Sequence, residues 1–252
     1  MMGASLLPAL RRAGAKSIDL VLPLRCIGCG ATVEGEGAFC AACFSGLRFV
    51  AEPACALCGF PFEFDQGDGA ICGACAAEPP EFDSARAVFA YDDASRDTVL
   101  AFKHADRTDA APSLARLMVS ALGGRLDHLD AVVPVPLHRT RLALRRYNQS
   151  SLLANALARL TGLRPLPDAL IRRRRTPSQG GLSASARRRN VAGAFAVNPR
   201  RAAQLTGRRI VLIDEVYTTG ATIAACTKAL RAGGVAEIHA LTLARVIRPG
   251  DP

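Results

Sequence analysis

Four cysteine pairs constrain the N-terminal third of the chain more than any other feature. Each pair has the form C-x-x-C, and the pairs follow one another closely: Cys26 and Cys29, Cys40 and Cys43, Cys55 and Cys58, Cys72 and Cys75. Two thiolates that lie two residues apart can hold one tetrahedral ion from a tight turn, and a second pair completes its coordination shell. We therefore expect two structural Zn²⁺ ions, bound by these eight cysteines, in a double zinc ribbon.

Two other uses of eight cysteines have to be weighed against zinc. Disulfides are typical of small secreted proteins, but the first residues contain no continuous apolar stretch of the kind that a signal peptide needs. A redox C-x-x-C motif follows a strand, opens a helix and does not recur four times. Zinc is therefore favoured, and sequential pairing of the motifs is preferred to a cross-braced arrangement because each half then closes locally.

The sequence predicts three parts along the chain. Residues 1–22 have the pattern of an amphipathic segment, residues 23–78 contain the cysteine pairs, and residues 84–248 form a larger domain after the Pro79-Pro80 hinge. No apolar run approaches the ~18 residues that a membrane-spanning helix requires. We expect a cytoplasmic protein without a membrane span.

Strands and helices alternate after the hinge. Apolar runs predict strands over residues 87–91, 131–135, 209–213 and 238–246. Helical periodicity and end signals predict helices over residues 95–103, 112–122 and 221–232, and a further helix that Asn148 caps and that runs to about residue 160. This alternation is typical of an α/β fold with a mostly parallel sheet that helices flank on both faces. Cys226 falls on the apolar stripe of the last helix, so we expect it to be a buried core residue.

Basic charge is concentrated in one stretch. Between Ala169 and Ile213 there are eleven arginines and no acidic residue, in a chain with a formal net charge of +10. Guanidinium groups match the geometry of phosphate oxygens. The stretch is therefore either a surface that faces an anion or a solvated loop with basic flanks.

The segment Ile210 to Thr222 (IVLIDEVYTTGAT) carries the strongest functional signal. A buried strand is followed by two acids, and a small, hydroxyl-rich loop then opens a helix. Ligands of open α/β sheets bind beyond the carboxyl ends of strands, and a helix N-terminus favours an anion. The Gly-Lys-Ser/Thr ending of a P-loop is missing. The pattern predicts a sugar phosphate, with its hydroxyls on Asp214 and Glu215. The phosphate is expected on Thr218, Thr219, Gly220, Ala221 and Thr222.

This segment closely resembles the phosphoribosyl-pyrophosphate (PRPP) loop of type I phosphoribosyltransferases. Other motifs follow the cysteine pairs in a fixed order: Phe102-Lys103, Val133 to His138, Arg145 to Ser150, Gln179, and Arg187 to Phe195. Taken together, the order is similar to that of the competence protein F (ComF) family. The resemblance implies a type I phosphoribosyltransferase-like sheet behind a double zinc ribbon, PRPP as ligand together with Mg²⁺, and a link to natural transformation and DNA uptake.

The resemblance also assigns roles to single residues. The turn after the second predicted strand matches the pyrophosphate loop, and the arginine-rich stretch matches the flexible hood. Glu215 stands where the family motif usually has a second aspartate, and its longer side chain is expected still to reach a hydroxyl. The implied pyrophosphate-binding residues are Lys103, Pro136, Leu137, His138 and Arg139.

Two functions fit these features. The first is an enzyme that transfers a phosphoribosyl group from PRPP to an acceptor, which no motif identifies. The second is a competence factor that binds single-stranded DNA and works with the DNA-uptake machinery, with a PRPP site that is regulatory or vestigial. Six of the ten phenylalanines lie among the cysteine pairs, as core filler or as a stacking platform for bases: Phe39, Phe44, Phe49, Phe60, Phe62 and Phe64.

Overall fold

The structure is a computed structural model that describes residues 24–35, 39–104, 107–177 and 180–247, without the side chains of Lys103 and His104. The amphipathic segment expected over residues 1–22 lies outside the described residues. None of the helices in the described ranges is long and apolar enough to cross a membrane.

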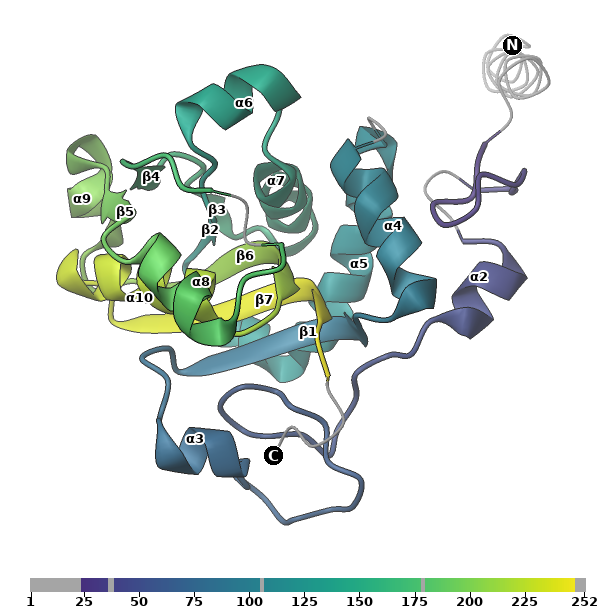
Figure 1. The fold of residues 1–252 in the computed structure, drawn as a ribbon, viewed down its shortest axis with the longest axis horizontal. Helices are drawn as coiled ribbons and strands as arrows, with labels where there is room; N and C mark the ends of the chain where they lie inside the picture. The colour runs from purple at the N-terminus through teal and green to yellow at the C-terminus, as the bar shows by residue number, and fades with distance from the viewer. Residues whose placement is uncertain (1–23, 36–38, 105–106, 178–179, 248–252) are drawn as a thin grey trace, which may run out of the picture.

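A five-stranded parallel sheet forms the centre of the molecule (Figure 1). Its order is β1-β7-β6-β2-β3. The strands are β1 (Ser84–Ala90), β2 (Ala131–Pro134), β3 (Arg164–Pro165), β6 (Arg209–Tyr217) and β7 (Glu237–Arg245). Ile210, Val211, Leu212 and Ile213 in β6 are fully buried, as a strand that is covered on both faces requires. The expected parallel α/β fold is confirmed.

Helices cover both faces of the sheet. The first face carries α4 (Asp93–His104), α5 (Ala111–Leu122) and α7 (Gln149–Thr161). The second face carries α10 (Ala221–Ala232), with α8 (Ala184–Val191) and a two-stranded antiparallel hairpin of β4 (Leu170–Arg172) and β5 (Phe195–Val197) beside it. The remaining helices are α2 (Ala41–Gly46), α3 (Gly73–Ala77), α6 (Arg139–Arg145) and α9 (Ala202–Leu205), with 3₁₀ turns at Thr108–Ala110, Gly123–His128 and Pro199–Arg201.

Alternation along the strands divides the core into two layers. Val211 and Ile213 pack with α5 and α7, whereas Ile210 and Leu212 pack with α10. Successive side chains of a strand point to opposite faces, which explains the division. Cys226 lies on α10 inside the second layer and is fully buried, as predicted. Burial raises the pKa of this thiol.

The strand predicted over residues 209–213 extends further than expected. β6 continues to Tyr217, so Asp214 and Glu215 lie within the strand and not beyond its end. Pairing continues because β7 remains alongside, with Asp214 opposite Thr242 and Val216 opposite Ala244. The run of apolar residues ends before the backbone pairing does.

The eight paired cysteines form two clusters in the sequential arrangement. The sulfur atoms within each cluster lie within 4.8 Å of one another. In the second cluster, the amides of Cys58 and Cys72 donate to Cys55 Sγ at 3.4 and 3.3 Å. Four converging sulfurs, one of which accepts two backbone hydrogen bonds, are a donor set that suits Zn²⁺. The clusters define a first ribbon (Cys26, Cys29, Cys40 and Cys43) and a second ribbon (Cys55, Cys58, Cys72 and Cys75).

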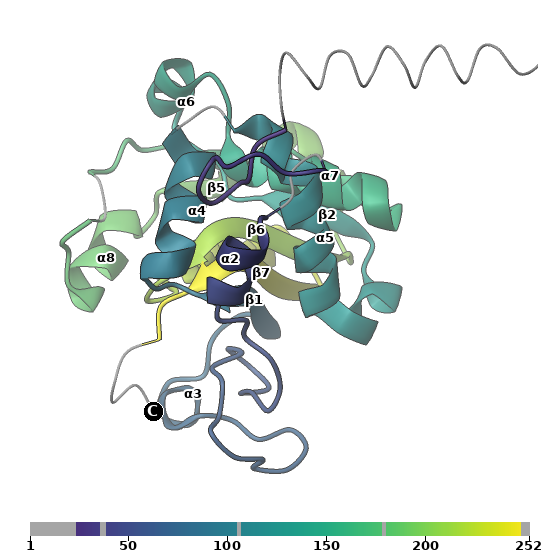
Figure 2. The same ribbon diagram turned by 90° about the vertical axis from the view of Figure 1, so that its right-hand side faces the viewer.

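The two ribbons lie against different parts of the body. The first ribbon, with α2, lies beside α4, and the second ribbon, with α3, lies below β1 (Figures 1 and 2). The segment between them pairs with the outer edge of β1, where Val50 N donates to Val88 O at 2.9 Å and Ala90 N donates to Arg48 O at 2.8 Å. Ala85 N donates to Leu57 O at 2.6 Å. The ribbon region therefore covers the free edge of β1.

Candidate ligand-binding site

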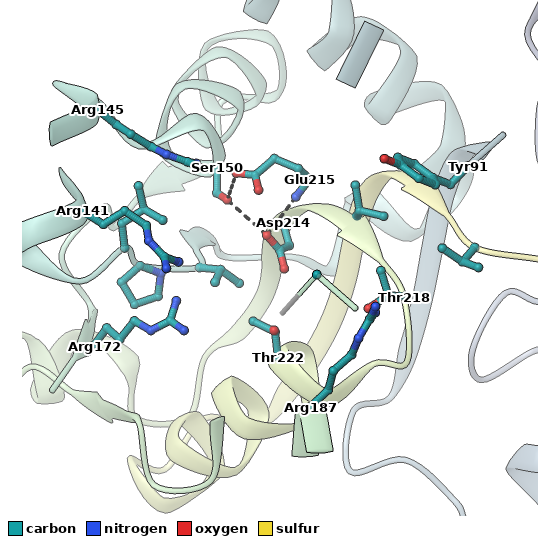
Figure 3. Close-up of a pocket in the computed structure, with 16 residues that line it drawn as sticks. Tyr91, Arg141, Arg145, Ser150, Arg172, Arg187, Asp214, Glu215, Thr218 and Thr222 are labelled. Carbon is teal, nitrogen blue, oxygen red and sulfur yellow. Dashed lines mark hydrogen bonds between the residues drawn. The ribbon is translucent and has the colours of Figure 1, made fainter. Parts of the chain in front are cut away.

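A cavity of about 550 Å³ opens at the carboxyl end of the sheet, and we call it the ligand cavity (Figure 3). Its walls come from the turn after β2, helix α6, the start of α7, strand β4, helix α8, the end of β6 and the start of α10. Polar residues gather at its centre and on two opposite sides. They are Arg141, Arg145, Ser150, Arg172, Arg187, Asp214, Glu215, Thr218 and Thr222.

Asp214 and Glu215 occupy the centre of the cavity, and Ser150 holds them together. Ser150 Oγ donates to Glu215 Oε1 at 2.7 Å and lies 3.5 Å from Asp214 Oδ1. The backbone amide of Glu215 donates to Asp214 Oδ1 at 2.9 Å. Glu215 is only 9% exposed, whereas the Asp214 carboxylate points into the open cavity (Figure 3). Asp214 is therefore the acid that can meet a ligand directly, and Glu215 lies behind it.

The turn after β2 is tied to the start of α7. Asn148 occupies the position before α7, as predicted, but its side chain does not cap that helix. Asn148 Nδ2 instead donates to Val135 O at 2.9 Å. This bond fixes the wall formed by Pro136 and Leu137 relative to Ser150.

The predicted phosphate loop has two sides. Thr218 and Thr222 line the ligand cavity. Thr219, Gly220 and Ala221 line a neighbouring cavity of about 400 Å³ that reaches the second ribbon, and Thr218 lines both cavities. Gly220 has φ +71° and precedes α10, so the loop presents the N-terminus of that helix, which favours an anion. The structure brings the five predicted residues into one turn but divides them between the two cavities.

Three arginines form the wall of the ligand cavity opposite the phosphate loop. The sequence analysis placed Arg145 in a motif and Arg172 in the arginine-rich stretch, but it did not single out Arg141. Arg141 and Arg145 lie on α6, and Arg172 lies on β4. Arg172 stacks on Phe195 at 5.1 Å and donates to the hydroxyl of Thr176. Burial and the charge of Arg141 lower the pKa of Arg172. A partly buried cation next to another cation is stabilised when an anion binds between them. We call this set the arginine wall.

Only part of the predicted pyrophosphate loop reaches the cavity. Pro136 and Leu137 line it. His138 caps α6, and its Nδ1 lies 2.9 Å from Thr140 Oγ1, while Arg139 is exposed and is not among the lining residues. The side chain of Lys103 lies outside the described part of the chain. The i, i+4 spacing of Arg141 and Arg145 would have been a usable signal had α6 been predicted.

The arginine-rich stretch does not act as one surface. Arg172 and Arg187 line the ligand cavity. Others are paired with acids: Arg201 with Asp168 at 2.9 Å, Arg209 with Asp130 at 3.5 Å and Arg188 with Glu78 at 3.7 Å. The pKa of the Asp130 carboxyl is lowered, mainly because the backbone amide of Arg209 donates a hydrogen bond to it. The stretch thus combines two cavity residues with structural ion pairs.

The phenylalanines of the ribbons serve two purposes. Phe60 and Phe62 pack against the core of the second layer. Phe39, Phe44 and Phe49 form a row in which neighbouring ring centroids lie 6.5 and 5.3 Å apart. Phe44 and Phe49 are 49% and 39% exposed. The row is therefore a partly exposed aromatic surface on the first ribbon.

Both the ribbon region and the sheet domain of this chain are similar to known proteins. Residues 17–77 match the family model of a double zinc ribbon domain, and residues 148–251 match that of a phosphoribosyl transferase domain. Competence protein F of Haemophilus influenzae is 31% identical over 227 residues, which span 88% of this chain and 96% of that protein. DNA utilization protein YhgH of Escherichia coli K12 is 31% identical over 218 residues, which span 84% and 92%. Competence protein ComFC of Bacillus subtilis is 27% identical over 221 residues, which span 82% and 83%. Each relative is matched over most of its length.

Proposed function

Because the chain belongs to the competence protein F family, we propose that its ligand cavity binds PRPP or a closely related ribose 5-phosphate. One observation carries this proposal. The carboxylate of Asp214 lies between the arginine wall on one side and the N-terminus of α10 on the other (Figure 3). A ligand with two anionic ends and hydroxyls in its middle is complementary to this order of charges.

Each part of PRPP has a counterpart in the cavity. The 5′-phosphate is assigned to the backbone of the loop before α10, with the hydroxyls of Thr218 and Thr222 as donors. The ribose hydroxyls are assigned to Asp214, with Glu215 and Ser150 in support. The diphosphate is assigned to the arginine wall, because guanidinium forks suit its oxygens. A Mg²⁺ ion bound with the diphosphate would find an oxygen ligand in Asp214, the acid that points into the cavity.

The same arrangement suits phosphoribosyl transfer. In that reaction the bond between ribose C1 and the diphosphate oxygen breaks, and the acceptor forms a new bond to C1. The diphosphate leaves with additional negative charge, which the preorganised arginine wall stabilises. Such a reaction needs no nucleophilic side chain, which agrees with a cavity lined by acids, arginines and hydroxyls.

Calorimetry with two ligands tests the assignment. PRPP with Mg²⁺ and ribose 5-phosphate, which lacks the diphosphate, are titrated into the unmodified chain and two variants. Arg145→Met should weaken PRPP binding about tenfold and leave ribose 5-phosphate unchanged, since a hydrogen bond to a charged group contributes about 1.5–3 kcal/mol. Arg139→Met, which changes an exposed arginine on the same helix, is the matched control. Absence of heat with both ligands would contradict the proposal.

Turnover is tested separately from binding. Release of pyrophosphate from PRPP, in the presence of candidate acceptors, should disappear in the Asp214→Ala, Glu215→Ala double variant. Release that is unaffected by the double variant would exclude this cavity as the reaction site.

A second function, binding of single-stranded DNA, is favoured by the aromatic row on the first ribbon. Exposed rings stack on bases without regard to sequence, and each stacked base contributes about 1–3 kcal/mol. Phe44 and Phe49 present such rings, at 49% and 39% exposure. This surface is separate from the ligand cavity, so one chain can have both functions.

Fluorescence anisotropy with a labelled oligo-dT tests this second function. The Phe44→Ala, Phe49→Ala double variant should weaken binding at least tenfold. Phe64→Ala is the control, because Phe64 is 73% exposed but belongs to no ring pair among the described residues. Equal losses in the two variants would indicate that the aromatic row has no special role.

A further inference from the structure

Arginines of the body donate hydrogen bonds to both zinc ribbons, and two of them, Arg245 and Arg107, have different surroundings. At the second ribbon, Arg245 Nη1 donates to Cys58 O at 2.6 Å, and Arg86 Nη1 donates to Cys55 O at 3.4 Å. At the first ribbon, Arg107 Nη1 donates to Cys26 O at 3.2 Å. Arg245 is 6% exposed and lies at the end of β7, whereas the side chain of Arg107 is 21% exposed. The bonds of Arg245 and Arg107 are equivalent in kind, so a difference between the effects of these two arginines depends on what else each one contacts.

Arg245 also contacts the residue that precedes the phosphate loop. Its guanidinium carbon lies 5.1 Å from the ring centroid of Tyr217 and 5.3 Å from that of Phe60. Tyr217 is opposite Arg245 in the pairing of β6 with β7. The cation therefore joins the second ribbon, through Cys58 and Phe60, to the last residue of β6.

Tyr217 in turn fills the space beside the turn of the loop. A Cβ atom on Gly220 would lie 2.5 Å from Tyr217 Oη, so the ring and the turn are in direct contact. Phe82 packs edge-on against the Tyr217 ring, with the ring centroids 6.3 Å apart. Burial raises the pKa of Tyr217, so its phenol stays neutral near neutral pH. A shift of this ring would displace the backbone that we assign to the 5′-phosphate.

The second ribbon is also part of the core that supports α10. Its four cysteines belong to the same buried cluster as Ala221, the first residue of α10. The first ribbon packs with the layer of α4 and α5 instead, through Ile27 and Leu47. Arg107 has its hydrogen bonds with Arg25, Cys26 and Asp109 in the described part of the chain.

We propose that Arg245 is a positioning residue that couples the second zinc site to the phosphate loop. Zinc held by the second ribbon keeps Arg245 and Tyr217 in place, and they keep the turn at Gly220 in the form that binds the phosphate. Coupling between two sites is reciprocal, so a ligand in the loop also strengthens zinc retention at the second ribbon. The first zinc site is outside this coupling. The ligand half of this inference rests on the proposed function.

The test compares Arg245→Met with Arg107→Met in the zinc-loaded chain. Zinc release is followed with a chromogenic chelator, and hydrogen exchange is followed at the amides of residues 218–222. Arg245→Met should release one of the two zinc ions about tenfold faster and raise exchange in the loop about tenfold. Arg107→Met should speed release of the other ion and leave loop exchange unchanged. Arg245→Lys keeps a donor but loses the planar stack, and it should restore part of the effect.

Three outcomes would overturn the inference. Loop exchange in Arg245→Met could match that of the unmodified chain, both arginine variants could raise it equally, or Arg245→Lys could behave no better than Arg245→Met. None of these measurements requires a ligand, so they decide the coupling even if PRPP does not bind. Added PRPP with Mg²⁺ should slow release of the second-site zinc alone. If PRPP gives no heat in calorimetry, the proposed function fails separately.

Discussion

At the scale of the residue, the geometry of the acids depends on Ser150. Its hydroxyl is the donor that satisfies the buried Glu215 carboxylate at 2.7 Å. Without that donor, the Glu215 carboxylate loses a hydrogen-bond partner at a site that water can hardly reach. The loss of such a buried hydrogen bond costs about 1–3 kcal/mol. Ser150→Ala should lower the free energy of unfolding by this amount and weaken PRPP binding about threefold to tenfold. Denaturation and calorimetry measure the two effects.

The control is Ser120→Ala on α5, where the serine is exposed. We expect this substitution to change stability by less than about 0.5 kcal/mol. If Ser150→Ala behaves like the control in both measurements, Ser150 does not organise the acids.

Single residues also show the limits of prediction from the sequence. Asp214 and Glu215 were found because they directly follow four apolar residues in the chain. Arg141 and Arg172 come together only when α6 and β4 meet across the cavity, and no local pattern indicates that meeting. The eight zinc ligands were found because C-x-x-C spacing is itself the binding geometry.

At the scale of the element, the turn between β6 and α10 has to satisfy two requirements at once. Gly220 has φ +71°, and Tyr217 leaves no space for a Cβ atom there. Gly220→Ala therefore adds a steric clash to the backbone strain of about 1–2 kcal/mol. We expect a loss of about 3 kcal/mol in stability and at least a tenfold loss in PRPP affinity, measured by denaturation and calorimetry.

Gly207 offers a matched control, with φ +70° and no described atom within 4 Å of the place that a Cβ atom would take. Gly207→Ala should cost about 1–2 kcal/mol and leave PRPP affinity unchanged. Similar affinity losses in the two variants would mean that the contact with Tyr217 is unimportant.

Elements with a long periodic pattern were predicted well, whereas some of the shortest were missed. The expected helices over residues 112–122 and 221–232 correspond to α5 and α10, with ends that agree to within one residue. β4 and β5 were missed because each has three residues and the segment between them is rich in arginine. Their pairing is stabilised by packing against α10, which is a tertiary contact that a local pattern does not contain.

At the scale of the whole molecule, the two zinc sites should contribute unequally to stability. Cys29 is exposed, whereas Cys75 is 5% exposed and belongs to the core of the second layer. Metal analysis should give two zinc ions per chain, and each variant should lose one. Cys75→Ser should lower the free energy of unfolding by at least about 2 kcal/mol more than Cys29→Ser does, because it also disturbs packed core. Equal losses would show that the second ribbon does not support the body.

The pairing of the ribbon region with β1 has a consequence for colloidal behaviour. β1 is an edge strand whose apolar run Ala87 to Ala90 is buried, and residues 48–50 and Leu57 occupy its outer hydrogen-bonding groups. An uncovered apolar edge is a template on which other chains add strands. We therefore expect metal in the ribbons to protect the chain from polymerisation. A chain stripped of zinc should form oligomers that are rich in intermolecular β-structure and scatter light. Prompt return of the metal should stop the growth of these oligomers.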